Sequence, residues 1–140
     1  MQIQETNDMH PCIIILTHGK AGEELLKSAE MIIGPMKDVF AFSLLPEQAP
    51  DEFQKEVSKK LNAIPEGSLV LTDLFGGTPS NCAIMLSKEY NIISVSGVNL
   101  AMLIEALNLR NHLTGNELAN QLVKLSRESI KNVIKEFITN

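Results

Sequence analysis

Two segments of the chain, IIILTHG at residues 13–19 and LVLTDLFGGTP at residues 69–79, indicate its architecture. Each begins as an unbroken run of aliphatic residues and ends abruptly in a titratable side chain, His18 in the first and Asp73 in the second. Aliphatic runs without polar alternation are typical of strands buried on both faces, as in a parallel sheet covered by helices. In such sheets the catalytic and ligand-binding residues lie just beyond the carboxyl ends of the strands. The two runs therefore place an imidazole and a carboxylate where chemistry is expected.

The rest of the chain alternates strand patterns with helix patterns. Gly34-Pro35 is a helix stop, and Thr78-Pro79 predicts an N-cap followed by proline at the first helical position. Residues 114–117 have the spacing of a capping box and open a long amphipathic helix. The predicted strands cover residues 12–17, 38–44, 69–72 and 91–96, and the predicted helices cover residues 23–33, 51–62, 78–88, 99–109 and 114–137.

This order of elements predicts a single α/β domain. Alternating strands and helices with right-handed crossovers give a doubly wound, mainly parallel sheet with helices on both faces. For four strands that begin in this way, the expected order is 2-1-3-4, which has its switch point between the first and third strands. Those two strands end in His18 and Asp73. The coincidence makes the pair a candidate site.

Length, charge and composition limit the classes of function. A chain of 140 residues suffices for one domain with its own core, and a net charge of −5 argues against nucleic acid as a partner. Cys12 and Cys82 lack metal-type spacing and are expected to be buried free thiols in a reducing cytoplasm. The sequence shows neither a signal peptide nor an apolar stretch of the ~20 residues that a membrane span needs. We therefore expect a cytoplasmic protein with a disordered lead at residues 1–11, in which His10 is a tail residue, and one domain at residues 12–140.

Three features would meet at the predicted switch point. His18 offers a nucleophilic nitrogen, and Asp73 could hold the other ring nitrogen as N–H and support positive charge on the ring. The turn formed by Gly76, Gly77 and Thr78 leads into a helix N-terminus, where unpaired N–H groups and the helix dipole favour an anion. A nucleophilic imidazole, an orienting carboxylate and an anion cradle are what a transient phosphohistidine requires.

Simpler interpretations exist for each of these features alone. A histidine at a strand end is often a packing residue, an aspartate before glycine is often a turn residue, and Gly-Gly-Thr-Pro is a common helix entry. A metal site at His18 and Asp73 lacks a third ligand, because His112 falls in a late loop. No P-loop motif is present for a nucleotide. The sequence therefore predicts neither a metal nor a cofactor, and the combination of features favours the functional interpretation.

Three segments resemble the signatures of the EIIA component of the mannose-type sugar phosphotransferase system. They are residues 17–19 after an aliphatic strand, residues 72–81, and residues 97–103, in the family's order and spacing. The resemblance covers residues 12–110 and extends plausibly through the helical remainder to residue 137. It implies that His18 is the phosphorylated residue, that Asp73 orients it, and that Thr78, with Gly76 and Gly77, helps to bind the phosphoryl group. Phe75 stands where some members carry tryptophan.

The resemblance also implies a relay between proteins. The phosphoryl group would arrive from the histidine phosphocarrier protein, rest on His18, and pass to the EIIB component and finally to sugar at the membrane components EIIC and EIID. Members are typically homodimers that exchange a C-terminal segment, and they associate peripherally with the membrane permease. Because both partners are proteins, the site should be a shallow crevice with an apolar rim, for which Phe75, Ala21 and Met102 are candidates; Leu74 is expected to pack in the core.

Two other functions remain open at this point. One is a non-catalytic regulatory module of the same fold that binds an anion or a protein at the same crevice. The other is the phosphotransfer subunit of a dihydroxyacetone kinase, which shares the fold. The presence of both His18 and Asp73 favours a phosphoryl relay over a binding module. His-Gly rather than His-Ser, together with the string at residues 73–79, favours the sugar-transport branch.

Overall fold

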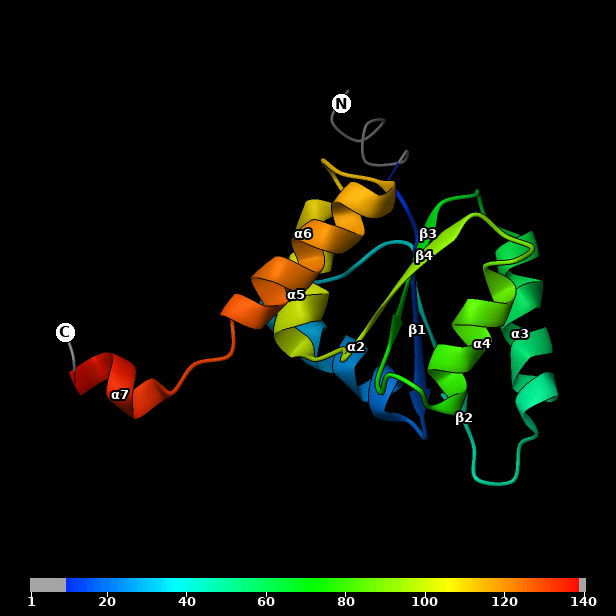
Figure 1. The fold of residues 1–140 in the computed structure, drawn as a ribbon, viewed down its shortest axis with the longest axis horizontal. Helices are drawn as coiled ribbons and strands as arrows, with labels where there is room; N and C mark the ends of the chain where they lie inside the picture. The colour runs from blue at the N-terminus through cyan, green and yellow to red at the C-terminus, as the bar shows by residue number, and fades with distance from the viewer. Residues whose placement is uncertain (1–9, 139–140) are drawn as a thin grey trace.

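The central feature of the computed structural model, which describes residues 10–138, is a four-stranded parallel sheet (Figure 1). The strands follow the order β2-β1-β3-β4, so the predicted order is confirmed. Every neighbouring pair is parallel, and Leu16 of β1 lies opposite Thr72 of β3. The strands are β1 (Ile13–His18), β2 (Val39–Leu44), β3 (Ser68–Thr72) and β4 (Ile92–Ser96).

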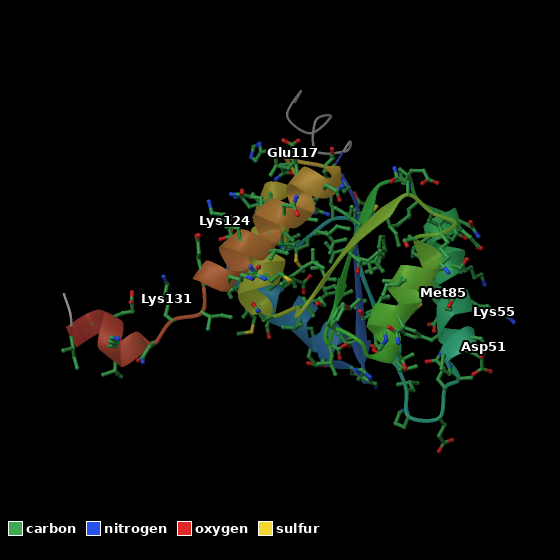
Figure 2. The ribbon with its side chains drawn as sticks, in the orientation of Figure 1. Asp51, Lys55, Met85, Glu117, Lys124 and Lys131 are labelled. Atoms are coloured by element: carbon green, nitrogen blue, oxygen red, sulfur yellow. The ribbon has the colours of Figure 1, made fainter. Side chains whose placement is uncertain are left out.

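Helices cover both faces of the sheet, as the doubly wound interpretation requires (Figure 1). One face packs against α2, α5 and α6, and the other packs against α3 and α4. Charged side chains on the outer helices, such as Lys55 on α3 and Lys124 on α6, point away from the sheet (Figure 2). The helices are α2 (Ala21–Ile33), α3 (Pro50–Asn62), α4 (Thr78–Leu86), α5 (Leu100–Leu109), α6 (Gly115–Glu128) and α7 (Val133–Ile138). None of the helices within residues 10–138 is long and apolar enough to cross a membrane.

The central strand β1 explains why the aliphatic run has no polar alternation. Ile13 and Ile15 point into the core beneath α2, α5 and α6, whereas Ile14 and Leu16 point into the core beneath α3 and α4. All four side chains are fully buried. Each one removed from water contributes roughly 1.5–3 kcal/mol, so both faces of this strand favour burial. His18, at the end of the same strand, is the first exposed position.

The C-terminal helix differs from the prediction. The sequence pattern predicts one helix over residues 114–137, but α6 ends at Glu128 and α7 stands apart from the sheet (Figure 1). Two polar side chains interrupt the helix. The Ser129 hydroxyl donates to the Ser126 carbonyl oxygen, and Asn132 Oδ1 accepts from the Lys135 N–H as in a new N-cap. The apolar residues beyond this break are exposed, and Phe137 is 77% exposed.

One predicted helix start and one predicted cap need correction. Gly77, not Thr78, is the N-cap of α4, and Thr78 is its first helical residue. Thr114 is the N-cap of α6, as predicted, but its side chain makes no capping hydrogen bond. Asn99, in contrast, caps α5 with its side-chain oxygen, which accepts from the Met102 N–H at 2.9 Å. Spacing alone thus located these helix starts to within one residue without fixing the capping atom.

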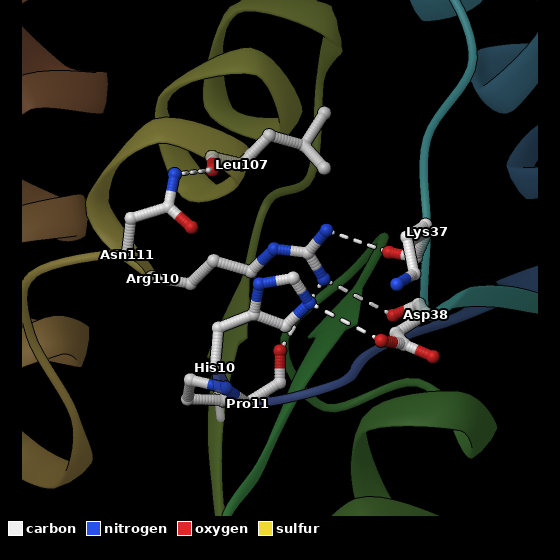
Figure 3. A network of polar contacts seen from close by, with 7 residues as sticks. All are labelled: His10, Pro11, Lys37, Asp38, Leu107, Arg110 and Asn111. Carbon is white, nitrogen blue, oxygen red and sulfur yellow. Dashed lines mark hydrogen bonds and ion pairs between the residues drawn. The ribbon is translucent and has the colours of Figure 1, made fainter. Parts of the chain in front are cut away.

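A buried arginine links the segments that precede β1 and β2, at the end of the sheet away from His18 (Figure 3). Arg110, the C-cap of α5, donates to the carbonyl oxygens of Lys37, Asp38 and Pro11 at 2.6, 3.1 and 3.3 Å. Burial lowers the pKa of its guanidinium from the usual value, and the nearby Asp38 opposes this effect. His10 Nε2 lies 3.2 Å from Asp38 Oδ2, so the expected tail residue is held in this network. Residues 1–9 of the predicted disordered lead lie outside the described residues.

Arg110→Met is expected to lower the free energy of unfolding by about 3 kcal/mol or more, because three carbonyl oxygens lose a charged donor in a buried setting. Urea unfolding at neutral pH measures the change. Arg127→Met is the matched control, since Arg127 lies exposed in the last turn of α6, and it should cost no more than about 0.5 kcal/mol. Equal stabilities of the two variants would contradict a bracing role for Arg110.

Candidate active site

The site is built from the carboxyl ends of two neighbouring strands. His18 is the last residue of β1, and Asp73 directly follows β3. His18 Nδ1 lies 3.0 Å from Asp73 Oδ2, and the His18 backbone N–H donates to the same oxygen at 2.9 Å. One carboxylate oxygen therefore fixes both the backbone and the ring of the histidine. The structure brings together the pair that the sequence analysis predicted.

The two side chains differ in exposure, which matters for their chemistry. The His18 side chain is 50% exposed, whereas the Asp73 side chain is 24% exposed. Because Asp73 accepts at Nδ1, the neutral ring carries its proton there and presents a lone pair at Nε2. Within the described residues, Nε2 makes no hydrogen bond. The arrangement leaves Nε2 as an accessible nucleophile on an oriented ring.

Gly77 brings the ring to the start of α4. A Cβ atom at Gly77 would lie 2.9 Å from His18 Cε1 and 3.6 Å from Nε2, so the ring edge occupies the space that any larger residue would need. Gly76 serves a different need, because its φ of +88° lies in the region that glycine adopts freely. This close approach was not predicted from the sequence, in which the pair of adjacent glycines is its one signal.

The N-terminus of α4, which lies beside the His18 ring, is more favourable for an anion than the N-termini of α2 and α3. The first turn of α4 contains no acidic residue, whereas α2 begins with Glu23 and Glu24 and α3 begins with Asp51 and Glu52. The Gly77 N–H is already donated to the Leu74 carbonyl oxygen at 3.0 Å. Thr78 lines a cavity of about 260 Å³ between the starts of α3 and α4. The helix start is thus positive and uncompensated by side chains of its own first turn.

Two of the three candidates for an apolar rim are exposed. Phe75 is 79% exposed in the turn after Asp73, and Ala21 is exposed at the start of α2. Leu74, which the sequence analysis expected in the core, is also exposed. Met102 is 4% exposed and packs in the core beneath α2, α5 and α6, so it is not a surface rim residue. It lines a groove of about 500 Å³ beside β4, which Phe75 and Ile84 also line.

Neither cysteine competes with His18 as a nucleophile. Cys12 and Cys82 are free and buried, as the sequence analysis expected. Burial raises the pKa of the Cys82 thiol to about 11 and also raises the pKa of Cys12, so both thiols stay protonated at neutral pH. Among residues 10–138, no three His, Cys, Asp or Glu side chains are grouped in a way that could hold a metal ion.

Comparison with known proteins identifies a family for this chain. Residues 12–123 match the EIIA-man family model, described as PTS system fructose IIA component. The chain is 34% identical to the PTS system fructose-specific EIIA component of Bacillus subtilis (strain 168), covering 85% of this chain and 84% of that protein. It is 35% identical to the PTS system mannose-specific EIIAB component of Escherichia coli (strain K12), covering 85% of this chain but 38% of that longer protein.

A solved structure supports the same relationship. The crystal structure of phosphotransferase system component EIIA from Streptococcus agalactiae superposes with a TM-score of 0.83 at 32% sequence identity, covering 89% of this chain and 98% of that one. The fold, the sequence identity and the match over most of the domain agree. The chain therefore belongs to the EIIA-man family of phosphotransferase system IIA components.

Proposed function

We propose that this sugar phosphotransferase system component carries a phosphoryl group on Nε2 of His18. The group comes from the phosphohistidine of the histidine phosphocarrier protein and passes to an EIIB component, so the reaction is a relay without hydrolysis. The observation that carries the proposal is the hydrogen bond between Nδ1 and Asp73 Oδ2, which leaves Nε2 available on a ring held at the start of α4.

The proposed chemistry needs no metal and no net proton transfer. The Nε2 lone pair attacks phosphorus, an N–P bond forms at His18, and the N–P bond of the donor histidine breaks. Positive charge moves from the donor ring to the His18 ring, where the Asp73 carboxylate lies 3.0 Å from Nδ1 and stabilises it. Asp73 thereby favours the state in which the group rests on this protein.

The start of α4 is the proposed cradle for the phosphoryl oxygens. Pro79 has no N–H, and the Gly77 N–H is used inside the turn. The donors proposed for the cradle are therefore the backbone N–H groups of Gly76 and Thr78 and the Thr78 hydroxyl, while Gly77 serves by leaving room for the ring. Each acts where negative charge is concentrated on the transferred group.

The partner proteins are proposed to dock on the apolar rim of Phe75, Leu74 and Ala21, all of which are exposed. Aromatic side chains in such positions are common anchors of protein interfaces. The net charge of −5 favours a partner with a basic face. A homodimer that exchanges a C-terminal segment, and peripheral association with the permease components EIIC and EIID, complete the proposal. The exposed apolar side chains beyond residue 129 are compatible with that exchange.

The test is the intact mass of the protein after incubation with phosphoenolpyruvate, enzyme I and the histidine phosphocarrier protein. We expect one acid-labile phosphoryl group, absent when the carrier is omitted and lost again when EIIB is added. No phosphoryl group on this chain beside a phosphorylated carrier would contradict the relay and favour the binding module. Acceptance without transfer to EIIB would favour a dihydroxyacetone kinase subunit.

A further inference from the structure

The hydroxyl group of Thr17 forms two hydrogen bonds directly behind the candidate site. Thr17 precedes His18 on β1 and is fully buried. Its Oγ1 donates to the Gly19 carbonyl oxygen at 3.1 Å and accepts from the Gly22 N–H at 2.9 Å. One side chain thus bridges the residue after His18 and the first turn of the following helix.

Helix α2 depends on this hydroxyl group for its cap. Its N-cap residue is Lys20, whose side chain makes no capping hydrogen bond. The Gly22 N–H is one of the groups that a helix start leaves without an intrahelical acceptor, and Gly22 is buried. Thr17 therefore supplies, from the preceding strand, the oxygen that an N-cap serine or threonine normally supplies.

The absence of a side chain at Gly22 makes this contact possible. A Cβ atom there would lie 3.0 Å from Ile15 Cγ2 and 3.3 Å from Thr17 Oγ1, both tighter than ordinary contacts. A larger residue at position 22 would require the side chain of Ile15 or Thr17 to shift, so glycine favours the close approach of α2 to β1. The pairing of Thr17 with Gly22 thus sets how closely the loop over residues 18–20 folds against the strand.

Three hydrogen bonds consequently hold the backbone of His18 and Gly19. Asp73 accepts from the His18 N–H, the Leu44 carbonyl oxygen of β2 accepts from the Gly19 N–H at 2.8 Å, and Thr17 donates to the Gly19 carbonyl oxygen. Gly19 has a φ of +57°, which glycine adopts without steric cost, so these hydrogen bonds select one of the many conformations open to this residue. Loss of the hydroxyl group would release a carbonyl oxygen and an amide at the same time.

We propose that Thr17 is a positioning residue for His18: its hydroxyl group holds the histidine loop and the start of α2 together, so that Nδ1 stays on Asp73 and Nε2 stays at the start of α4. The expected change in rate rests on the proposed function, whereas the expected change in the orientation of the His18 ring does not. Thr17 lies behind the strand end, fully buried, and acts through the backbone that carries the imidazole.

The test compares three variants of the full chain. Thr17→Val keeps the shape and removes the hydroxyl group, and we expect phosphoryl acceptance to slow by about tenfold or more, because small misplacements of a reacting group cost that much. Thr17→Ser keeps the hydroxyl group and should stay within about twofold of wild type. Thr72→Val is the matched control: Thr72 is equally buried and precedes Asp73, but its hydroxyl group has no partner among the described residues. It should also stay within about twofold.

A second measurement separates positioning from mere stability. The ring ¹⁵N spectrum of His18 reports which nitrogen carries the proton, and we expect Thr17→Val alone to lose the single Nδ1–H form. A wild-type spectrum and rate for Thr17→Val, or an equal loss in Thr17→Ser, would overturn the proposal. If Thr17→Val does not fold, hydrogen exchange in the wild type decides, since an unprotected Gly22 amide would also overturn it. If wild type accepts no phosphate, the proposed function fails, and the ring spectra still test the role of Thr17.

Discussion

Replacement of His18 by alanine is expected to abolish phosphoryl acceptance while leaving the fold intact. The variant removes the nucleophilic Nε2, and the rate should fall by at least about 10³-fold, to the limit of detection. Stability should change by no more than about 1 kcal/mol, because the side chain is half-exposed and Asp73 keeps the backbone N–H of residue 18 as a partner. Intact mass after incubation with the phosphorylated carrier, together with urea unfolding, measures both effects.

His112→Ala is the control for this experiment. His112 is exposed between α5 and α6, and its replacement should leave acceptance unchanged. An acid-labile phosphoryl group that persists in His18→Ala would place the acceptor elsewhere and remove His18 from the mechanism. Loss in both variants would point to a general effect of histidine removal on the carrier interaction.

Replacement of Asp73 by asparagine is expected to slow phosphoryl acceptance by about 10²- to 10³-fold without preventing folding. An amide oxygen can still accept from one of the two His18 N–H groups that share Oδ2. It cannot balance the positive charge that reaches the ring as the N–P bond forms. Single-turnover transfer from the phosphorylated carrier gives the rate, and the ring ¹⁵N spectrum shows whether Nδ1 remains protonated.

Asp51→Asn provides the matched change of one carboxylate. Asp51 is exposed in the first turn of α3, and its substitution should leave the transfer rate within about twofold of wild type. A rate for Asp73→Asn equal to that of Asp51→Asn would mean that Asp73 orients the ring without contributing charge, or has no part in the reaction. The ring spectrum distinguishes these two cases.

The sheet and its order could be predicted because the aliphatic runs of β1 and β3 are visible in the sequence itself. Ile13 and the three aliphatic residues after it pack alternately into the two cores, so the run indicates a strand buried on both faces. The C-terminal helix could not be predicted in the same way. Its apolar stripe continues through residue 137, but local side-chain hydrogen bonds of Ser129 and Asn132 compete with the helix. The spacing of apolar residues carries no information about such hydrogen bonds.

In the candidate site too, some features could be predicted from the sequence and others could not. His18 and Asp73 follow from strand order alone, because the carboxyl ends of adjacent parallel strands meet. Burial of Met102 and exposure of Leu74 depend on how α5 and the turn after β3 sit on the sheet, and residue type does not determine this. The contact between Gly77 and the ring also requires three dimensions, since it joins residues that are far apart in sequence.

The half-exposed ring of His18 has a consequence for the lifetime of the proposed phosphohistidine. An enzyme that closes over a reactive group protects it from water, but a group that two different proteins must reach in turn cannot be enclosed. A phosphoryl group on this ring would stand in contact with solvent between the two encounters. Rapid transfer to the acceptor protein, rather than shielding from solvent, would then limit hydrolysis of the phosphohistidine. The concentration of the acceptor protein would set the fraction of phosphoryl groups lost to water.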